Sequence, residues 1–452
     1  MSHSRRKFIK NGALAGTGLY LGATAFSAKS YANIIGANDR VRVGVIGFSD
    51  RFRQSLFPSF LNHYKELNFD ITGVSDLWNY RRDAGVAHIK EKTSRDVKGF
   101  RNNEALYDSK TADAVIISTA DFQHALHTIE AVNAKCDAYV EKPFAETMED
   151  ARAALKAVKA SRQIIQIGSQ RRSGSNYKAA EEYIKSGKFG AINMVELTWN
   201  VNQPGRWRRP DLVARLKQED TDWKRFLINR PFEAWDPRKY LEYRLFWPYS
   251  SGQPGQWMSH QIDTVHWFSG LKHPRSVTAN GGIYNWSDGR SNWDTTTAVF
   301  DYGDANDPAN GFQVVFMSRM GNGDENPSEI YFSKGGELNL ITNKVSPKGG
   351  LRENHAKAMN MQPVLLPEMA LVEKAEKVVA SANTGGDPLT SAHMRNWMEC
   401  VRSRRETNAP VEAGYYHSIA NVMTTAASRT GMKATFNEKT QEVMVGDKVF
   451  TY

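Results

Sequence analysis

The sequence has very little cysteine. Cys136 and Cys400 are the two cysteines among 452 residues, and no CxxC or Cys/His spacing is present, which excludes a disulfide framework and a cysteine-based zinc site. We expect both to be small buried residues. Internal repeats and low-complexity tracts are also absent. With 40% hydrophobic and 24% charged residues, the chain is long enough for two globular domains with their own cores.

Acidic residues are missing from the first 32 positions. Five of the basic residues that make up the net charge of +10 lie there, which leaves +5 spread thinly over the rest of the chain. A nucleic-acid-binding protein concentrates its positive charge on one face or helix. We therefore expect no nucleic-acid partner.

The leader, residues 1–32, has the order of an export signal. Ser4-Arg5-Arg6-Lys7-Phe8-Ile9-Lys10 precedes an uncharged run over residues 12–26 that is short and rich in glycine and alanine. This order resembles a twin-arginine signal, which implies the twin-arginine export machinery as a partner and a periplasmic location. The alternatives are a basic signal for unfolded chains and an uncleaved leader that would leave the protein membrane-associated.

The first half of the mature chain alternates apolar runs with helical patterns. Such a βαβ series predicts a doubly wound parallel sheet, and so a Rossmann domain over residues 33–168. The expected strands are residues 41–46, 69–75, 114–118, 138–140 and 164–167, and the expected helices are residues 79–92, 122–133 and 147–160.

The second half has a different pattern of predicted secondary structure, with longer loops from about residue 194 followed by β-rich stretches. We predict a second α+β domain over residues 169–452, with a large, mainly antiparallel open sheet through which the chain could form a homo-oligomer. The β-rich stretches are residues 276–284, 295–302, 311–318 and 329–339, and helices over residues 393–404 and 415–430 are expected to pack back on the first domain.

A dinucleotide loop is expected where the first strand turns into the first helix. Gly47, Phe48 and Ser49 stand where backbone N–H groups can hold a pyrophosphate. The fingerprint is incomplete, because Ser49 replaces its second glycine and Phe52 its third. An ordinary strand-to-helix turn explains this segment nearly as well.

Asp76 strengthens the cofactor hypothesis because it ends the second predicted strand, where a carboxylate can accept both ribose hydroxyls of the adenosine. A carboxylate there repels a 2′-phosphate, so NAD is expected rather than NADP. Arg81 and Arg82 follow closely and favour a phosphate, and a helix N-cap is the structural alternative for Asp76.

Several motifs in the expected order resemble one enzyme family. Tyr139-Val140-Glu141-Lys142-Pro143 at the end of a strand is similar to the signature of the Gfo/Idh/MocA family of glucose-fructose oxidoreductases and inositol dehydrogenases. The other matching segments are Ser118-Thr119 with His124, Gly168-Ser169-Gln170-Arg171-Arg172, Tyr249-Ser250-Ser251-Gly252, His260-Gln261-Ile262-Asp263 and Trp397-Met398-Glu399-Cys400.

The resemblance implies an NAD-dependent sugar or polyol oxidoreductase and assigns roles to these residues. Cofactor contacts are expected from Thr119, His124, Glu141 and Lys142, in addition to the loop and Asp76. The expected catalytic residues are Lys142 and His260, and the expected substrate-binding residues are Arg172, Tyr249, Gln256 and Asp263. At the position of Gln256 many members of this family carry an acid or an amide, and an amide cannot act as an acid or base.

Oxidation of a secondary alcohol needs a base for the hydroxyl proton and a group that stabilises alkoxide character. His260 is the expected base, and Lys142 is the expected cation at the end of a parallel strand. Taken singly, a lysine before proline is usually solvated and a histidine among aromatics is usually structural.

A metal site is not expected. His260, Asp263 and His266 share part of one helical face, but no further ligand is evident, so Asp263 is expected to orient His260 or a substrate hydroxyl. Seven of the eleven tryptophans lie between residues 199 and 267, a mixture suited to stacking on sugars or to a protein core. Interleaved with them are Arg206, Arg208, Arg209 and Arg244, and such arginines would make an anionic sugar credible if they line the pocket.

Three functions remain open from the sequence. The first is net dehydrogenation of a sugar, glycoside or polyol by an enzyme that retains its NAD. The second is glycosidic cleavage in which NAD is reduced and restored within one turnover. The third is non-catalytic sugar binding with a degenerate cofactor site.

Overall fold

The computed structural model describes residues 39–307, 310–323, 327–375, 378 and 385–451. The twin-arginine leader predicted over residues 1–32 lies outside these residues. In the described part of the chain, no helix combines the length and the hydropathy needed to cross a bilayer.

The first sheet is parallel throughout and has the order β3-β2-β1-β4-β5-β6 among the described residues. Strands β4 and β5 are entirely buried, because helices cover both faces of a doubly wound sheet. The strands are β1 (Val41–Ile46), β2 (Phe69–Ser75), β3 (Lys98–Phe100), β4 (Ala114–Ile117), β5 (Asp137–Val140) and β6 (Ile165–Ile167).

Two helices of this half, α5 and α7, begin at polar side-chain caps. The Thr147 hydroxyl accepts a hydrogen bond from the Asp150 backbone at 3.1 Å, and Glu149 and Asp150 lie in the first turn, where acidic side chains favour the positive helix end. The helices are α3 (Phe57–Leu61), α4 (Asn79–Thr93), α5 (Asn103–Asp108), α6 (His124–Asn133) and α7 (Met148–Lys159).

The second sheet is mixed and mostly antiparallel. Its order is β14-β13-β12-β11-β7-β10-β9-β8-β15-β16-β17, and β10 pairs with β7 in parallel while the other pairs are antiparallel. The strands are β7 (Ile192–Asn200), β8 (Ser276–Gly282), β9 (Thr295–Tyr302), β10 (Phe312–Arg319), β11 (Ser328–Ser333), β12 (Gly336–Asn339), β13 (Lys344–Ser346), β14 (Met369–Ala370), β15 (Ala434–Asn437), β16 (Glu442–Val445) and β17 (Lys448–Val449).

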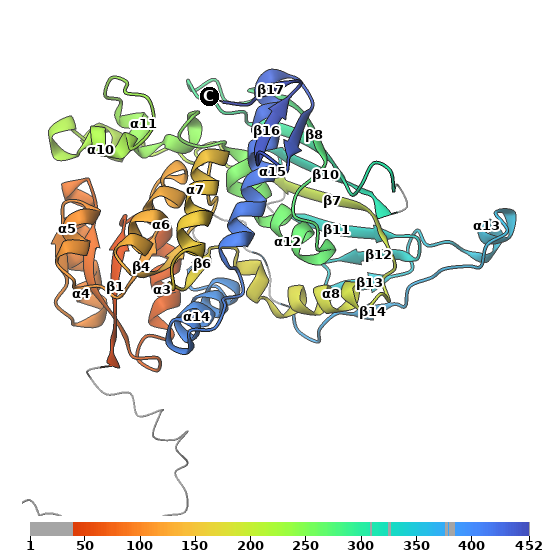
Figure 1. Ribbon diagram of the computed structural model, residues 1–452, viewed down its shortest axis with the longest axis horizontal. Coiled ribbons are helices and arrows are strands. Elements are labelled where there is room, and N and C mark those ends of the chain that lie inside the picture. The colour runs from red at the N-terminus through yellow and green to blue at the C-terminus, as the bar shows by residue number, and fades with distance from the viewer. Residues whose placement is uncertain (1–38, 308–309, 324–326, 376–377, 379–384, 452) are drawn as a thin grey trace, which may run out of the picture. The chain divides into compact units, whose positions relative to one another are not determined.

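Helices α8, α12 and α15 lie on one face of the second sheet, whereas the short helices α10 and α11 lie beside the first sheet's helix α5 (Figure 1). The chain between β7 and α12 therefore reaches across to the first half. The helices are α8 (Ser175–Lys185), α9 (Pro210–Arg215), α10 (Trp223–Leu227), α11 (Pro237–Leu241), α12 (Ser259–Ser269), α13 (Glu353–Ala358), α14 (Pro388–Ser403) and α15 (Val411–Thr430).

Helix α15 contacts both sheets. The Phe144 backbone N–H donates to His417 Nε2 at 3.0 Å, and the Ala145 N–H donates to the Ser418 hydroxyl at 3.2 Å. The C-terminal part of the chain also reaches β6, where the Ile167 N–H donates to the Ala409 carbonyl at 2.8 Å. The loop that follows Lys142 is thus held by residues near the end of the chain.

The predicted fold class, a parallel Rossmann sheet followed by a large, mostly antiparallel sheet, is confirmed. The predicted β-rich stretch over residues 329–339 forms two strands of a hairpin, β11 and β12, joined at Lys334-Gly335. Gly336, the first residue of β12, has φ +145°, which L side chains rarely adopt, so glycine is favoured directly after the turn. Both cysteines are buried free thiols, as expected, and burial raises the pKa of Cys136 to about 11.

Candidate active site

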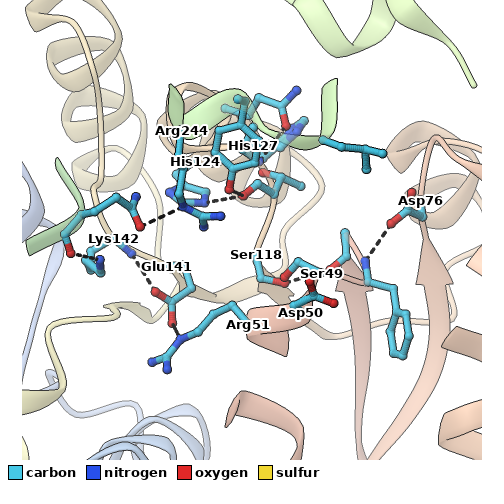
Figure 2. Close-up of a pocket in the computed structure, with 18 of the residues that line it drawn as sticks. Ser49, Asp50, Arg51, Asp76, Ser118, His124, His127, Glu141, Lys142 and Arg244 are labelled. Carbon is cyan, nitrogen blue, oxygen red and sulfur yellow. Dashed lines mark hydrogen bonds and ion pairs between the residues drawn. The ribbon is translucent and has the colours of Figure 1, made fainter. Parts of the chain in front are cut away.

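A cavity of about 300 Å³ opens at the carboxyl ends of β1, β2, β4 and β5 (Figure 2). Doubly wound folds bind their ligands at this edge. The opposite wall comes from a segment between β7 and α12, residues 206–245, which we call the crossing segment. Ten residues expected in the site line the cavity: Gly47, Phe48, Ser49, Asp76, Thr119, His124, Glu141, Lys142, Gln256 and His260.

The loop after β1 has the geometry that a dinucleotide needs. Gly47 has φ +83°, and a Cβ there would meet Thr119 Cγ2 at 2.8 Å, so only glycine fits. The Ser49 hydroxyl accepts a hydrogen bond from the Phe52 N–H at 3.2 Å and so caps the following helix. Backbone N–H groups and a helix N-terminus therefore face the cavity in spite of the incomplete glycine pattern.

Phe52 stands where the fingerprint has its third glycine. Its ring is fully buried and lies 5.8 Å from the Phe48 ring and 5.6 Å from the Phe57 ring. The helix contains a wide π-helical turn, Phe52–Leu56, at this point. The close helix–strand contact that a glycine permits is thus replaced here by aromatic packing.

Asp76 follows β2, as predicted, and lines the cavity. Its carboxylate accepts hydrogen bonds from the backbone N–H groups of Phe48 and Trp78, each at 2.9 Å. Burial raises the pKa of this carboxyl, and the two hydrogen bonds oppose that effect. The acceptor expected for the adenosine ribose is therefore tied directly to the dinucleotide loop.

Asp50, in the same loop, forms ion pairs with arginine side chains. It forms ion pairs with Arg81 at 2.9 Å and with Arg209 of the crossing segment at 3.1 Å. Arg82 pairs with Asp83 at 3.0 Å. These partners hold Arg81 and Arg82, the two side chains that favoured a 2′-phosphate in the sequence.

Thr119 and His124 line the cavity beyond β4. The His124 ring lies 2.7 Å from the Pro143 carbonyl and 3.2 Å from the Thr119 carbonyl, so it joins the loops that follow β4 and β5. Burial lowers the pKa of His124. The Thr119 hydroxyl is buried and has no protein partner among the described residues, which leaves it available to a bound ligand.

Glu141 and Lys142 follow β5 at the centre of the cavity. Glu141 accepts a hydrogen bond from Arg51 at 2.8 Å, and although burial opposes its ionisation, Arg51 and Lys142 hold its pKa below the ordinary value. The Lys142 ammonium donates to the Gln256 carbonyl at 2.6 Å. Burial lowers the pKa of Lys142 to about 7, against the opposing effect of Glu141.

His260 lies in the first turn of α12 and lines the cavity with Lys142. Its ring stacks on Trp199 with centroids 5.7 Å apart. Burial and then the Lys142 charge lower the pKa of His260 well below its ordinary value. The imidazole is therefore neutral near pH 7 and can accept a proton.

Three predicted substrate-binding residues lie outside the cavity lining. Arg172 binds the Asp263 carboxylate through two hydrogen bonds of 2.8 and 2.9 Å, so Asp263 is committed to Arg172 and makes no hydrogen bond to His260 among the described contacts. The Tyr249 ring is buried against Phe122. These residues support the fold around the cavity.

Tryptophans form the wall beside His260. Trp199 and Trp257 are parallel with centroids 6.1 Å apart, and Trp207 lies 5.2 Å from Trp257. These three line the cavity, whereas the other four in the tryptophan-rich stretch do not. Arg206, Arg209 and Arg244 also line it. Arg208 instead pairs with Glu242 at 3.0 Å.

The structure describes no cluster of three or more His, Cys, Asp or Glu residues that could hold a metal ion. His266, which shares a helical face with His260, lies 2.8 Å from the Tyr302 hydroxyl.

The sequence did not indicate the cavity residues Arg51, Tyr240 and Tyr243, nor Asp121, which supports the cavity from behind. Asp121 does not line the cavity itself but is fully buried behind Gln256. An acidic residue four positions after the end of a buried strand was the available signal for Asp121. No local pattern marks the tyrosines, because their placement depends on how the crossing segment folds over the first sheet.

Comparison with known proteins agrees with this geometry. Residues 41–169 match the Gfo/Idh/MocA family, described as an oxidoreductase family with an NAD-binding Rossmann fold. This part of the chain is similar to the Rossmann domain of the Gfo/Idh/MocA oxidoreductases. This match confirms NAD as the cofactor type of the domain.

Proteins similar to this chain include polyol and sugar enzymes. It is 30% identical over 210 residues to an inositol 2-dehydrogenase of Rubrobacter xylanophilus, covering 44% of this chain and 55% of the relative. It is 27% identical over 171 residues to a 1,5-anhydro-D-fructose reductase of Ensifer adhaerens, covering 36% of this chain and 51% of the relative. The chain thus spans about half the length of these relatives.

Solved structures share the fold over most of the chain. The WlbA dehydrogenase of Bordetella pertussis, in complex with NADH and UDP-GlcNAcA, has a TM-score of 0.61 at 16% identity, covering 88% of this chain and 99% of that one. A levoglucosan dehydrogenase in complex with NADH and levoglucosan has a TM-score of 0.62 at 13% identity, covering 88% and 99%.

Proposed function

We propose that the protein is an NAD-dependent oxidoreductase that oxidises a secondary hydroxyl of a sugar, glycoside or polyol. The observation that carries this proposal is the meeting of Lys142 and His260 in one cavity beside the dinucleotide loop, both with lowered pKa values. Inositol and levoglucosan dehydrogenases among the similar proteins support the substrate class.

Different residues of the cavity would perform proton transfer, substrate orientation and cofactor binding. Neutral His260 accepts the proton of the substrate hydroxyl, and Lys142 donates to the same oxygen and orients it. The tryptophan wall excludes water and supports the apolar face of a sugar ring. Gly47, Ser49 and Asp76 would hold NAD, which when bound accepts the hydride from the substrate carbon.

The cofactor is proposed to remain bound through many turnovers. The crossing segment supports this proposal because it joins the Rossmann half around the cavity: Arg209 pairs with Asp50, and the Gln123 side chain donates to the Phe226 carbonyl at 2.7 Å. Bound NADH would then be reoxidised in place, either by a second sugar or by the returning intermediate of glycosidic cleavage.

Retention is tested on protein purified without added nucleotide. We expect about one NAD(H) per chain after extensive dialysis and a change in its absorbance when substrate is added. Tightly bound NAD should also stabilise the fold, because a ligand at about a thousand times its dissociation constant stabilises the native state by about 4 kcal/mol. Arg209→Gln should shorten retention. Cofactor-free folded protein that works only with millimolar external NAD would contradict retention.

The product distinguishes the proposed reaction from its alternatives. A keto sugar with an intact glycosidic linkage supports net oxidation, and a free reducing sugar supports cleavage. Sugar binding without any bound nicotinamide would make the protein a non-catalytic sugar-binding protein.

Export by the twin-arginine route is part of the proposal, supported by Ser4-Arg5-Arg6-Lys7-Phe8-Ile9-Lys10. Cell fractionation of the full chain should place it in the periplasm, and the double variant Arg5→Lys, Arg6→Lys should keep it in the cytoplasm. Unchanged export of the double variant would contradict this route.

A further inference from the structure

Gln256, at the position where the family pattern has an acid or amide, connects three charged groups. Its Oε1 accepts a hydrogen bond from Arg244 Nε at 2.9 Å, and its Nε2 donates to the Asp121 carboxylate at 2.6 Å. Its backbone carbonyl accepts the hydrogen bond from Lys142. A carboxylate only accepts and a guanidinium only donates, so the orientation of the amide is determined by its two partners.

Asp121 fixes this arrangement from behind. Its carboxylate is fully buried and also accepts a hydrogen bond from the Ser250 hydroxyl at 2.6 Å. Its second oxygen lies 3.9 Å from Arg244 Nε. A buried carboxylate with these partners holds Gln256 in one rotamer, and Gln256 in turn holds the Arg244 guanidinium.

The Arg244 guanidinium extends into the cavity on the side of Lys142 and Glu141 (Figure 2). It lies over the Tyr243 ring, 4.7 Å from the centroid. Among the described residues, Nε is its only nitrogen with a hydrogen-bond partner. Its two terminal amino groups are therefore presented, already oriented, to whatever occupies the cavity.

Two parallel N–H donors match the two oxygens of a carboxylate. Because Arg244 and Lys142 are both bound to Gln256, the anion that Arg244 receives must lie close to the hydroxyl that Lys142 orients. The pyrophosphate of the cofactor has its own place at the Gly47 loop, where Asp50 gathers Arg81 and Arg209.

We propose that Arg244 is a substrate-binding residue that receives the carboxylate of an acidic sugar, such as a uronic or aldonic acid, with Gln256 and Asp121 as its positioning residues. This inference rests on the proposed function. It gives Gln256 a role that needs no acid or base: the amide holds the arginine that selects the substrate. A neutral sugar would leave the two amino groups of Arg244, which face the cavity, without a charged acceptor, so it is discriminated against.

The test compares acidic sugars with their neutral counterparts on the holoenzyme, for example methyl glucuronosides with methyl glucosides and gluconate with glucitol. We expect kcat/KM to favour the best acid over its neutral partner by at least about 100-fold. Arg244→Gln should abolish this preference by raising KM for the acid. Arg319→Gln, an exposed charge on β10, is the matched control and should leave the preference unchanged.

Two further variants test the positioning residues. Gln256→Glu offers Arg244 an internal carboxylate of the same size and removes the donor to Asp121, so it should raise KM for acids more than KM for neutral sugars. Asp121→Asn should lower the acid preference by about tenfold through KM, whereas a merely structural defect would lower both rates alike.

Binding is measured separately from turnover with the Lys142→Met variant loaded with NAD. Thermal shift with an acidic and a neutral sugar should show selective stabilisation by the acid, lost in the double variant with Arg244→Gln. Equal stabilisation by both sugars, or loss of NAD affinity in Arg244→Gln with the acid preference intact, would overturn the inference and in the second case assign Arg244 to the cofactor. Acid-selective binding with no sugar oxidised would leave Arg244 as the anion site and contradict the proposed oxidation.

Discussion

The cavity has two walls of different construction. One wall consists of residues that directly follow parallel strands, such as Gly47, Asp76 and Lys142. The other consists mainly of the crossing segment, which contains only short helices and reaches the first wall through ion pairs such as Arg209 with Asp50. The strand-end wall offers the dinucleotide loop and, together with α12, the proposed proton-transfer pair. The crossing segment offers the side chains that we propose to bind and enclose the substrate.

This difference suggests separate roles for the two walls, one in catalysis and the other in substrate choice. Strand ends in a doubly wound sheet are placed by the sheet itself, so chemistry located there tolerates changes in the loops. A long irregular segment can change its side chains without changing the sheet. Substrate choice is therefore expected to depend on the crossing segment and catalysis on the strand ends and α12.

The largest effects are expected from the two proposed catalytic residues. Lys142→Ala and His260→Ala should each lower turnover by at least about 100-fold, because one removes the group that polarises the oxygen and the other removes the base. Steady-state rates with the best sugar measure this. NAD content and the thermal midpoint are the controls and should survive, and near-normal rates in either variant would remove that residue from the mechanism.

Cofactor choice tests the strand-end wall alone. The unaltered protein should bind NAD far better than NADP, and Asp76→Ser should narrow the gap by at least about tenfold, because the carboxylate that repels a 2′-phosphate is gone. Calorimetry on protein stripped of nucleotide measures both affinities. Tighter NADP binding by the unaltered protein would contradict the role of Asp76.

The pH profile distinguishes two roles for Lys142. Its pKa is about 7, so if the ammonium form orients the substrate, kcat/KM should fall by about tenfold per pH unit above that value. His260 has a pKa well below its ordinary value and should add no change near pH 6.5. Lys142→Arg, which stays charged, should move the fall to higher pH. A rate that rises through pH 7 would make Lys142 the base.

The smallest effect is expected at Glu146, which lies in the loop after Lys142 and does not line the cavity. Glu146 is buried and accepts a hydrogen bond from Ser251 at 3.2 Å, and burial followed by the Asp121 charge raises its pKa. A carboxyl that stays protonated only in the native state contributes stability at low pH and loses it as pH rises through its folded pKa. Glu146→Gln should therefore flatten the decline of the thermal midpoint between pH 6 and pH 8 by roughly 2 °C. A slope equal to that of the unaltered protein would show that Glu146 does not titrate there.

The strand-end wall could be predicted from the sequence because its residues are set by local rules. The predicted first two strands match β1 and β2 residue for residue, and Asp76 and Lys142 follow from where strands end. The pairing of Arg172 with Asp263 could not be predicted, because the two are 91 positions apart and nothing local marks them as partners. The same holds for Asp121, whose role depends on the approach of Gln256.

The bonds from α15 to the loop after Lys142 determine when the site can be completed during synthesis. His417 and Ser418, which hold the backbone of Phe144 and Ala145, are made after nine-tenths of the chain. N-terminal domains usually finish folding while the ribosome still adds the next domain. Here the first domain emerges early but its central lysine loop is secured last, so a nascent chain that stalls before α15 would carry an incomplete site. A complete site therefore indicates that synthesis has passed α15.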